Sequence, residues 1–179
     1  MNSWPPLAPL RAVVGRLESA GLVCALGGSG LLASLGLADS ARDWDLTTDQ
    51  PLARVREALR ELDHDLVGPN RAHADTKLQL AGGQIELIVG FAIRSGDAVI
   101  RLPTIVTGRW IGVPTGSPEV WAAAYQIMGR PEKAALLFGL LEKRGVDGAA
   151  VARLLAEPLP QELREQLGRL PKRATSSNT

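Results

Sequence analysis

Residues 22–49, LVCALGGSGLLASLGLADSARDWDLTTD, decide the fold that we expect for this chain. Residues 22–26 form an apolar run bounded by glycines, which favours a short buried strand. The turn Gly27-Gly28-Ser29 follows, and the apolar spacing after Ser29 predicts a helix over residues 29–35. Glycines allow close backbone approach to a ligand, and a helix beginning here directs free N–H groups toward the turn. The turn is therefore a candidate anion site.

A second strand, predicted over residues 43–47, carries the aspartates Asp43 and Asp45. Because side chains alternate along a strand, both carboxylates should share one face, with Trp44 on the other. Adjacent carboxylates repel each other, and a divalent cation with oxygen ligands neutralises such a pair. An anion-binding turn near a carboxylate pair indicates metal-assisted chemistry on a nucleoside triphosphate.

Trp44 should pack on the face away from the two carboxylates. The apolar helix faces available there are those of residues 13–17 and 52–59. Truncation of a buried Trp should then be strongly destabilising.

Gly27-Gly28-Ser29, a spacer of 13 residues and then Asp43-Trp44-Asp45 resemble the signature of the nucleotidyltransferase superfamily. The resemblance is to its small bacterial branch, which includes aminoglycoside nucleotidyltransferases and nucleotidyltransferase-like toxins of abortive-infection systems. It spans about residues 21–145. Trp44 is bulkier than the aliphatic residue usual at that place.

The resemblance implies a third acid on a later strand, and Glu86 matches it in place and context. Asp43, Asp45 and Glu86 would then be the metal ligands and catalytic residues, with Mg²⁺ or Mn²⁺ as cofactor. Glu86 would serve as ligand or as general base for the incoming hydroxyl. An acid inside an apolar strand is costly unless it is paired, so a Glu paired with Arg or Lys is the alternative.

The nucleotide-binding residues implied by the resemblance are Gly27, Gly28, Ser29, Arg130 and Lys133. Ser29 would bind the terminal phosphates, unless it is only a helix cap. Arg130 and Lys133 flank a predicted helix start and resemble a basic segment of related enzymes, although the spacing differs by one residue. They bind phosphate or are simply solvated.

Two further basic side chains, Lys77 and Arg42, are possible helpers at the same site.

Hydrophobic periodicity predicts the remaining elements. Helices are expected at residues 8–20, 51–62, 117–128, 132–144, 147–156 and 160–168. Strands are expected at residues 64–67, 76–80, 84–91, 97–101 and 104–107, the second and third forming a hairpin. This order predicts an α+β fold with an α/β-like core, a mixed sheet, flanking helices and a C-terminal helical bundle. The expected divisions are a core at 1–112, a helical region at 113–170 and a disordered tail at 171–179.

Composition limits the function classes. The net charge of +1 gives no strong field for nucleic acid. The single Cys24 excludes an internal disulfide and favours a reducing cytoplasm. The chain start lacks the features of a signal peptide. The uncharged run at residues 19–38 is broken by glycines, so no membrane span is expected.

The predicted function is metal-dependent transfer of a nucleoside monophosphate from a triphosphate such as ATP to a hydroxyl of a small molecule or protein, with release of pyrophosphate. Nucleic acid is the less favoured acceptor. One alternative is a non-catalytic nucleotide-binding module of the same fold. The other is a dinucleotide-binding protein, because residues 28–33 match the G-x-G-x-x-G/A fingerprint.

Overall fold

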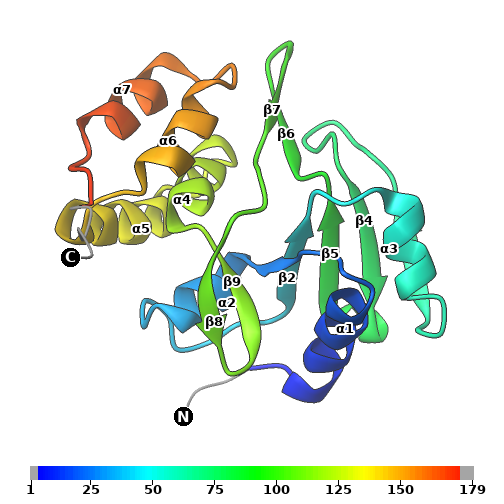
Figure 1. Ribbon diagram of the computed structural model, residues 1–179. Coiled ribbons are helices and arrows are strands. Elements are labelled where there is room, and N and C mark those ends of the chain that lie inside the picture. The colour runs from blue at the N-terminus through cyan, green and yellow to red at the C-terminus, as the bar shows by residue number, and fades with distance from the viewer. Residues whose placement is uncertain (1–3, 174–179) are drawn as a thin grey trace.

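The computed structural model describes residues 4–173, and most of the expected tail, residues 174–179, lies outside the described residues. A seven-stranded mixed sheet of order β3-β4-β5-β2-β1-β9-β8 forms the centre (Figure 1). Its strands are β1 Ala25–Leu26, β2 Trp44–Thr48, β3 His64–Val67, β4 Thr76–Leu80, β5 Ile85–Val89, β8 Val106–Trp110 and β9 Val113–Gly116. The mixed sheet with flanking helices confirms the predicted fold class.

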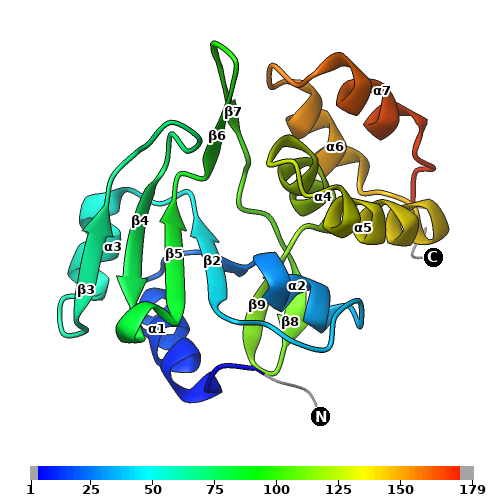
Figure 2. The same cartoon turned by 180° about the vertical axis from the view of Figure 1, so that it is seen from behind.

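Helices cover the sheet and extend beyond it. They are α1 Leu7–Ser19, α2 Gly28–Ser34, α3 Leu52–Ala58, α4 Pro118–Ile127, α5 Pro131–Arg144, α6 Gly148–Leu155 and α7 Gln161–Arg169. The last four form one group beside the sheet (Figure 2). No described helix is long and apolar enough to cross a bilayer.

The hydrophobic core is divided into two clusters by the sheet. One joins α1 and α3 to the sheet face that carries Trp44, Leu46 and Leu87. The other joins α2 and the C-terminal helices to the face that carries Ile88. The acidic side chains of β2 and β5 alternate with Trp44 and Leu87, so they lie on the second face.

The predicted packing of Trp44 is confirmed. Its side chain is 0% exposed and packs in the same cluster as α1 and α3. Its indole N–H donates to the Pro6 carbonyl over 3.4 Å. The bulky residue therefore acts as a core anchor on the face opposite the carboxylates.

Helix caps follow the sequence signals. The Ser117 hydroxyl accepts a hydrogen bond from the Val120 N–H over 3.2 Å, with Pro118 as the first residue of α4. Asp147 caps α6 in the same way, and Gly145 ends α5 with a positive φ of 74°.

Several details differ from the prediction. Asp43 lies in the bend before β2, which begins at Trp44, so only Asp45 of the pair is within the strand. The first strand is shorter than expected and comprises only Ala25 and Leu26. A separate hairpin, β6 Ala92–Ser95 and β7 Ala98–Arg101, replaces the single weak strand predicted there.

The dinucleotide-binding alternative is wrong. That fold requires β1 and β2 to be parallel strands joined by the intervening helix. In the structure β1 pairs with β2 in antiparallel orientation, Ala25 opposite Thr47. Strand β9 pairs with β1 in parallel orientation, so residues 113–116 belong to the sheet.

Candidate active site

The candidate active site lies on the sheet face opposite Trp44. Strands β2 and β5 are parallel neighbours with Asp45 in register with Glu86, so the two carboxylates stand side by side. A cleft of about 600 Å³ opens above them. Six of the predicted residues line it, namely Ser29, Asp43, Asp45, Glu86, Arg130 and Lys133. Ser29 and Lys133, which are 104 positions apart in the sequence, thereby lie in one cleft.

Gly27 and Gly28 are not among the residues that line the cleft. Gly28 has a φ of +54°, and a Cβ added to it would lie 1.8 Å from an oxygen of Asp45. A Cβ on Gly27 would lie 1.9 Å from the Trp121 ring of α4. The two glycines let the start of α2 approach both the acidic strand and α4. The Gly27 N–H also donates to the Asp45 carbonyl over 2.8 Å.

Negative charge is crowded at Asp45. The pKa of Asp45 is raised from 3.8 to about 7, chiefly by burial and in addition by the neighbouring carboxylates of Asp43 and Glu86. The ammonium groups of Lys77 and Lys133 oppose these effects. Such a carboxylate is stabilised by any added positive charge.

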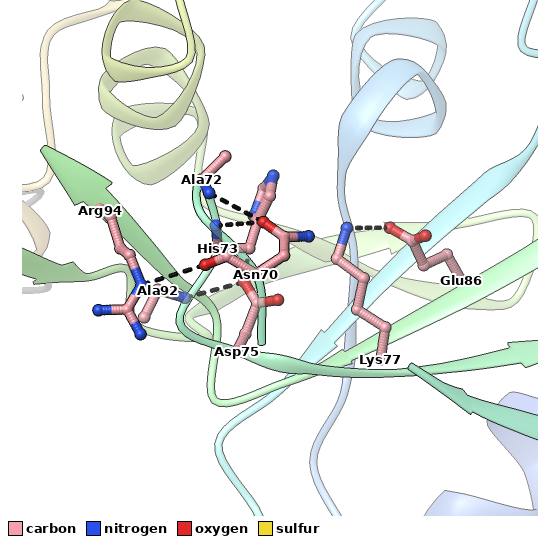
Figure 3. Close-up of polar contacts among 8 residues, drawn as sticks. All are labelled: Asn70, Ala72, His73, Asp75, Lys77, Glu86, Ala92 and Arg94. Atoms are coloured by element: carbon pink, nitrogen blue, oxygen red, sulfur yellow. Dashed lines mark hydrogen bonds and ion pairs between the residues drawn. The ribbon is translucent and has the colours of Figure 1, made fainter. Parts of the chain in front are cut away.

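Glu86 is paired with a lysine. The Lys77 Nζ donates to the Glu86 Oε1 over 2.7 Å, and both side chains reach up from the sheet into the cleft (Figure 3). The side chains are only 17% and 25% exposed, so the pair is partly shielded from water. The paired Glu left open by the sequence is therefore present, and Lys77 is its partner.

Basic groups form the wall of the cleft on the α2 and α5 side. The Lys133 Nζ donates to the Ser29 Oγ over 2.9 Å and lies 5.4 Å from the centre of the Tyr125 ring. Burial lowers the pKa of Lys133, and the nearby guanidinium of Arg130 lowers it further. Arg42 lines the cleft as well. The wall suits an anion, which would relieve the repulsion among these cations.

The side chains of the cleft include oxygen donors suited to a divalent cation. Asp43 and Asp45 supply carboxylate oxygens, the ligands that Mg²⁺ and Mn²⁺ prefer. Within residues 4–173, no three His, Cys, Asp or Glu side chains are grouped closely enough to hold a metal. The Asp pair fits a cation, and Glu86, whose Oε1 accepts from Lys77, would be a third donor through its other oxygen.

A second polar cluster lies on the same side of β4 but outside the cleft (Figure 3). The buried Asp75 accepts a hydrogen bond from the Ala92 N–H over 3.2 Å, and His73 Nδ1 is 3.4 Å from the same carboxylate oxygen. Asn70 accepts from the N–H groups of Ala72 and His73. These contacts join the loop before β4 to β6.

The sheet order, the Gly-Gly-Ser turn and the acidic strand together define the class: the chain has the nucleotidyltransferase fold, as the resemblance predicted. A candidate nucleotidyltransferase from Thermotoga maritima is 22% identical, with a TM-score of 0.50 over 75% of this chain and 91% of that one. The antibiotic-resistance factor ANT(2'')-Ia in solution is 15% identical, with a TM-score of 0.57 over 89% of each chain.

A crystal structure of ANT(2'')-Ia in complex with adenylyl-2''-tobramycin is 14% identical, with a TM-score of 0.53 over 80% of this chain and 94% of that one. No protein-family model and no curated protein sequence matches the chain. At these identities the likeness establishes the fold, and the chemistry must be argued from the residues of this chain.

Proposed function

We propose that this protein is a metal-dependent nucleotidyltransferase that moves a nucleoside monophosphate from a nucleoside triphosphate such as ATP to an acceptor hydroxyl, releasing pyrophosphate. The observation that carries the proposal is the charge layout of the cleft. Carboxylates of Asp45 and Glu86 stand in register on its floor, and the cations of Arg130 and Lys133 stand on its wall. A polyphosphate with a bound cation is complementary to both.

Asp43 and Asp45 would hold Mg²⁺ or Mn²⁺, which when bound neutralises phosphate charge and positions the α-phosphorus for in-line attack. Lys133 and Arg130 would bind the outer phosphates, because charge-assisted hydrogen bonds to phosphate are strong. Ser29 adds a hydroxyl at the same wall. These residues orient the triphosphate and balance its charge.

Glu86 is the group best placed to accept the proton of the acceptor hydroxyl, since it stands beside Asp45 in the cleft. A carboxylate engaged by an ammonium group is a weaker base. Lys77 must therefore turn away from Glu86, or share it, before proton transfer. The pair holds Glu86 in place until then.

For the acceptor we favour a small hydroxyl compound or a protein side chain over a nucleic acid. The net charge of +1 provides little attraction for a polyanion. The likeness to ANT(2'')-Ia bound to adenylyl-2''-tobramycin supports a polyhydroxylated acceptor.

The thiol of Cys24 is buried and free, and we place the activity in a reducing cytoplasm.

The test is incubation of the protein with α-phosphate-labelled nucleoside triphosphates, Mg²⁺ and fractionated cell extract. The expected result is label on a small molecule or a protein, with stoichiometric pyrophosphate. Asp45→Asn should abolish transfer while its circular dichroism spectrum stays unchanged. Full activity in this variant would refute the role of Asp45, and label on RNA alone would refute the acceptor class.

A non-catalytic nucleotide-binding module is the second candidate, and the Lys77–Glu86 ion pair favours it. In that case the cleft would bind a triphosphate, and no pyrophosphate would appear with any acceptor fraction. Calorimetric titration with a non-hydrolysable ATP analogue, run beside the transfer assay, separates binding from turnover.

A further inference from the structure

One cation of the cleft stands apart from the other three. Those three lie close together, since burial lowers the pKa of Lys133 and the guanidinium groups of Arg130 and Arg42 lower it further. The fourth, Lys77, belongs to β4, and the sheet order β4-β5-β2-β1 places this strand beyond β5 and away from β2. The carboxylates on β2 and β5 therefore lie between Lys77 and the group of three cations.

The two sides of the acidic centre suit two different substrates. Under the proposed function, the group of three cations binds the outer phosphates, which leave as pyrophosphate. In nucleotidyl transfer the attacking and the leaving oxygen lie roughly in line with the phosphorus between them. The acceptor hydroxyl must then approach from the side opposite the departing pyrophosphate. That side is the β4 side of Glu86, and Lys77 is the charged group in contact with Glu86 there.

Lys77 has the donors and the surroundings needed to bind an anion. Its ammonium group has three N–H donors, and within residues 4–173 it donates to one side chain, Glu86 (Figure 3). Two N–H groups therefore remain for a ligand. The Lys77 side chain is only 17% exposed, and an ion pair partly shielded from water is stronger than one in bulk solvent. Phosphate and carboxylate groups are the anions that such a lysine binds.

A single Lys77 matches a single anionic group close to the reacting hydroxyl. Its Nζ lies 2.7 Å from the Glu86 Oε1, so an anion bound to Lys77 is only a few bonds away from a hydroxyl at Glu86. Lys77 is the only Lys or Arg in strands β3, β4 and β5. A nucleic acid requires several cations along its backbone, which this side of the sheet lacks. A compound with several ammonium groups would be repelled by Lys77.

Building on the proposed function, we propose that Lys77 determines the specificity for the acceptor, and that the acceptor is a small hydroxyl compound with a phosphate or carboxylate group near the reacting hydroxyl. The anionic group binds the Lys77 ammonium, and the hydroxyl donates to Glu86. The acceptor oxygen then bonds to the α-phosphorus, the bond from this phosphorus to pyrophosphate breaks, and the hydroxyl proton passes to Glu86. An anion that shares Lys77 also makes Glu86 a stronger base.

The first experiment determines the charge and size of the acceptor. Cell extract is filtered to remove macromolecules, and the filtrate is separated on anion- and cation-exchange columns at neutral pH. Each fraction is incubated with the wild-type protein, Mg²⁺ and α-phosphate-labelled nucleoside triphosphates. Label should appear with the fraction that the anion exchanger retains, and mass spectrometry of the product should find a phosphate or carboxylate in its acceptor half. Tobramycin, which carries several ammonium groups, should receive no label.

The outcomes separate this inference from the proposed function. Label on a cationic or neutral compound, or only on the RNA or protein held back by the filter, overturns the inference and leaves nucleotidyl transfer intact. Transfer to no fraction at all, filtered or unfiltered, refutes the proposed function and the inference together.

The second experiment measures, by calorimetry with Mg²⁺, the affinity for a non-hydrolysable ATP analogue and, with the analogue present, for the purified acceptor. Lys77→Gln should lower the acceptor affinity about tenfold or more, as expected for a lost hydrogen bond between charged groups, and should leave the affinity for the analogue unchanged. Lys77→Arg retains the positive charge and should retain more of the acceptor affinity than Lys77→Gln does.

Arg42→Gln is the matched control, because it removes one positive charge from the other side of the same cleft. It should lower the affinity for the ATP analogue and leave the acceptor affinity unchanged. Thermal melting shows whether each variant is folded. A folded Lys77→Gln variant with unchanged acceptor affinity, or one that loses affinity for the analogue alone, overturns the inference.

Discussion

Gly28 is where a single methyl group should disconnect the turn from the acidic strand. In Gly28→Ala the new Cβ would start 1.8 Å from an Asp45 oxygen, and real Cβ contacts are almost never below 3.0 Å. The carboxylate must therefore retreat by more than 1 Å. A φ of +54° also strains any L-residue, at about 1–2 kcal/mol. Strain and displacement should both be measurable.

Gly36→Ala separates these two effects. Gly36 follows the same helix with a φ of +71°, and nothing lies within 4 Å of its added Cβ. Both variants should lose about 1–2 kcal/mol through φ, measured by urea denaturation. Only Gly28→Ala should also lose transfer activity, by about 100-fold, because a misplacement of about 1 Å at a reacting centre costs that much. Equal activity in the two variants would refute the role given to this close approach.

Three further results are expected. The pKa of Asp45 is about 7 in the folded protein against 3.8 in the unfolded chain, so the folded state binds this proton more tightly. In EDTA the free energy of unfolding should therefore fall, by at most about 4 kcal/mol, as the pH rises from 4 to 7. Asp45→Asn should flatten this pH profile. Lys77→Met removes the partner of Glu86 and should raise the affinity for Mn²⁺ several-fold in calorimetry. Lys143→Met, at an exposed position of α5, is the control and should leave this affinity unchanged. Equal Mn²⁺ affinities of the two variants would place Glu86 outside the metal site. Trp44→Ala should cost about 3–5 kcal/mol in denaturant melts, whereas Trp44→Leu should still bind nucleotide; a stable Trp44→Ala variant would contradict the anchor role.

Local signals in the sequence were sufficient for much of the fold. The strands at 64–67 and 76–80 have the bounds predicted for them, because alternation and glycine turns delimit them locally. The caps Ser117 and Asp147 were readable because a cap bonds to N–H groups only two or three residues away. Strand β7 falls within the strand predicted at residues 97–101, whereas its partner β6 was missed because its polar and apolar residues follow no clear period.

The partner of Glu86 could not be predicted from the sequence, for a physical reason. Several basic residues were available, and the choice depends on how β4 and β5 align. In the observed register Gln79 is opposite Glu86 and Lys77 is opposite Ile88, so Lys77 reaches Glu86 diagonally on the shared face. A shift of one residue would point Lys77 away.

The sequence places the glycine turn next to the acidic strand, but it does not reveal the close contacts that require glycine at positions 27 and 28. The sequence suggested that Gly27 and Gly28 admit a ligand, whereas in the structure their missing side chains admit Asp45 and Trp121. The hydrogen bond from the Gly27 N–H to the Asp45 carbonyl joins the turn to the acidic strand. Two short segments separated by a 13-residue spacer thus become one rigid unit, with a hydroxyl on one side and a carboxylate on the other. The close contacts of Gly28 with Asp45 and of Gly27 with Trp121 are by themselves a reason why positions 27 and 28 have no side chain.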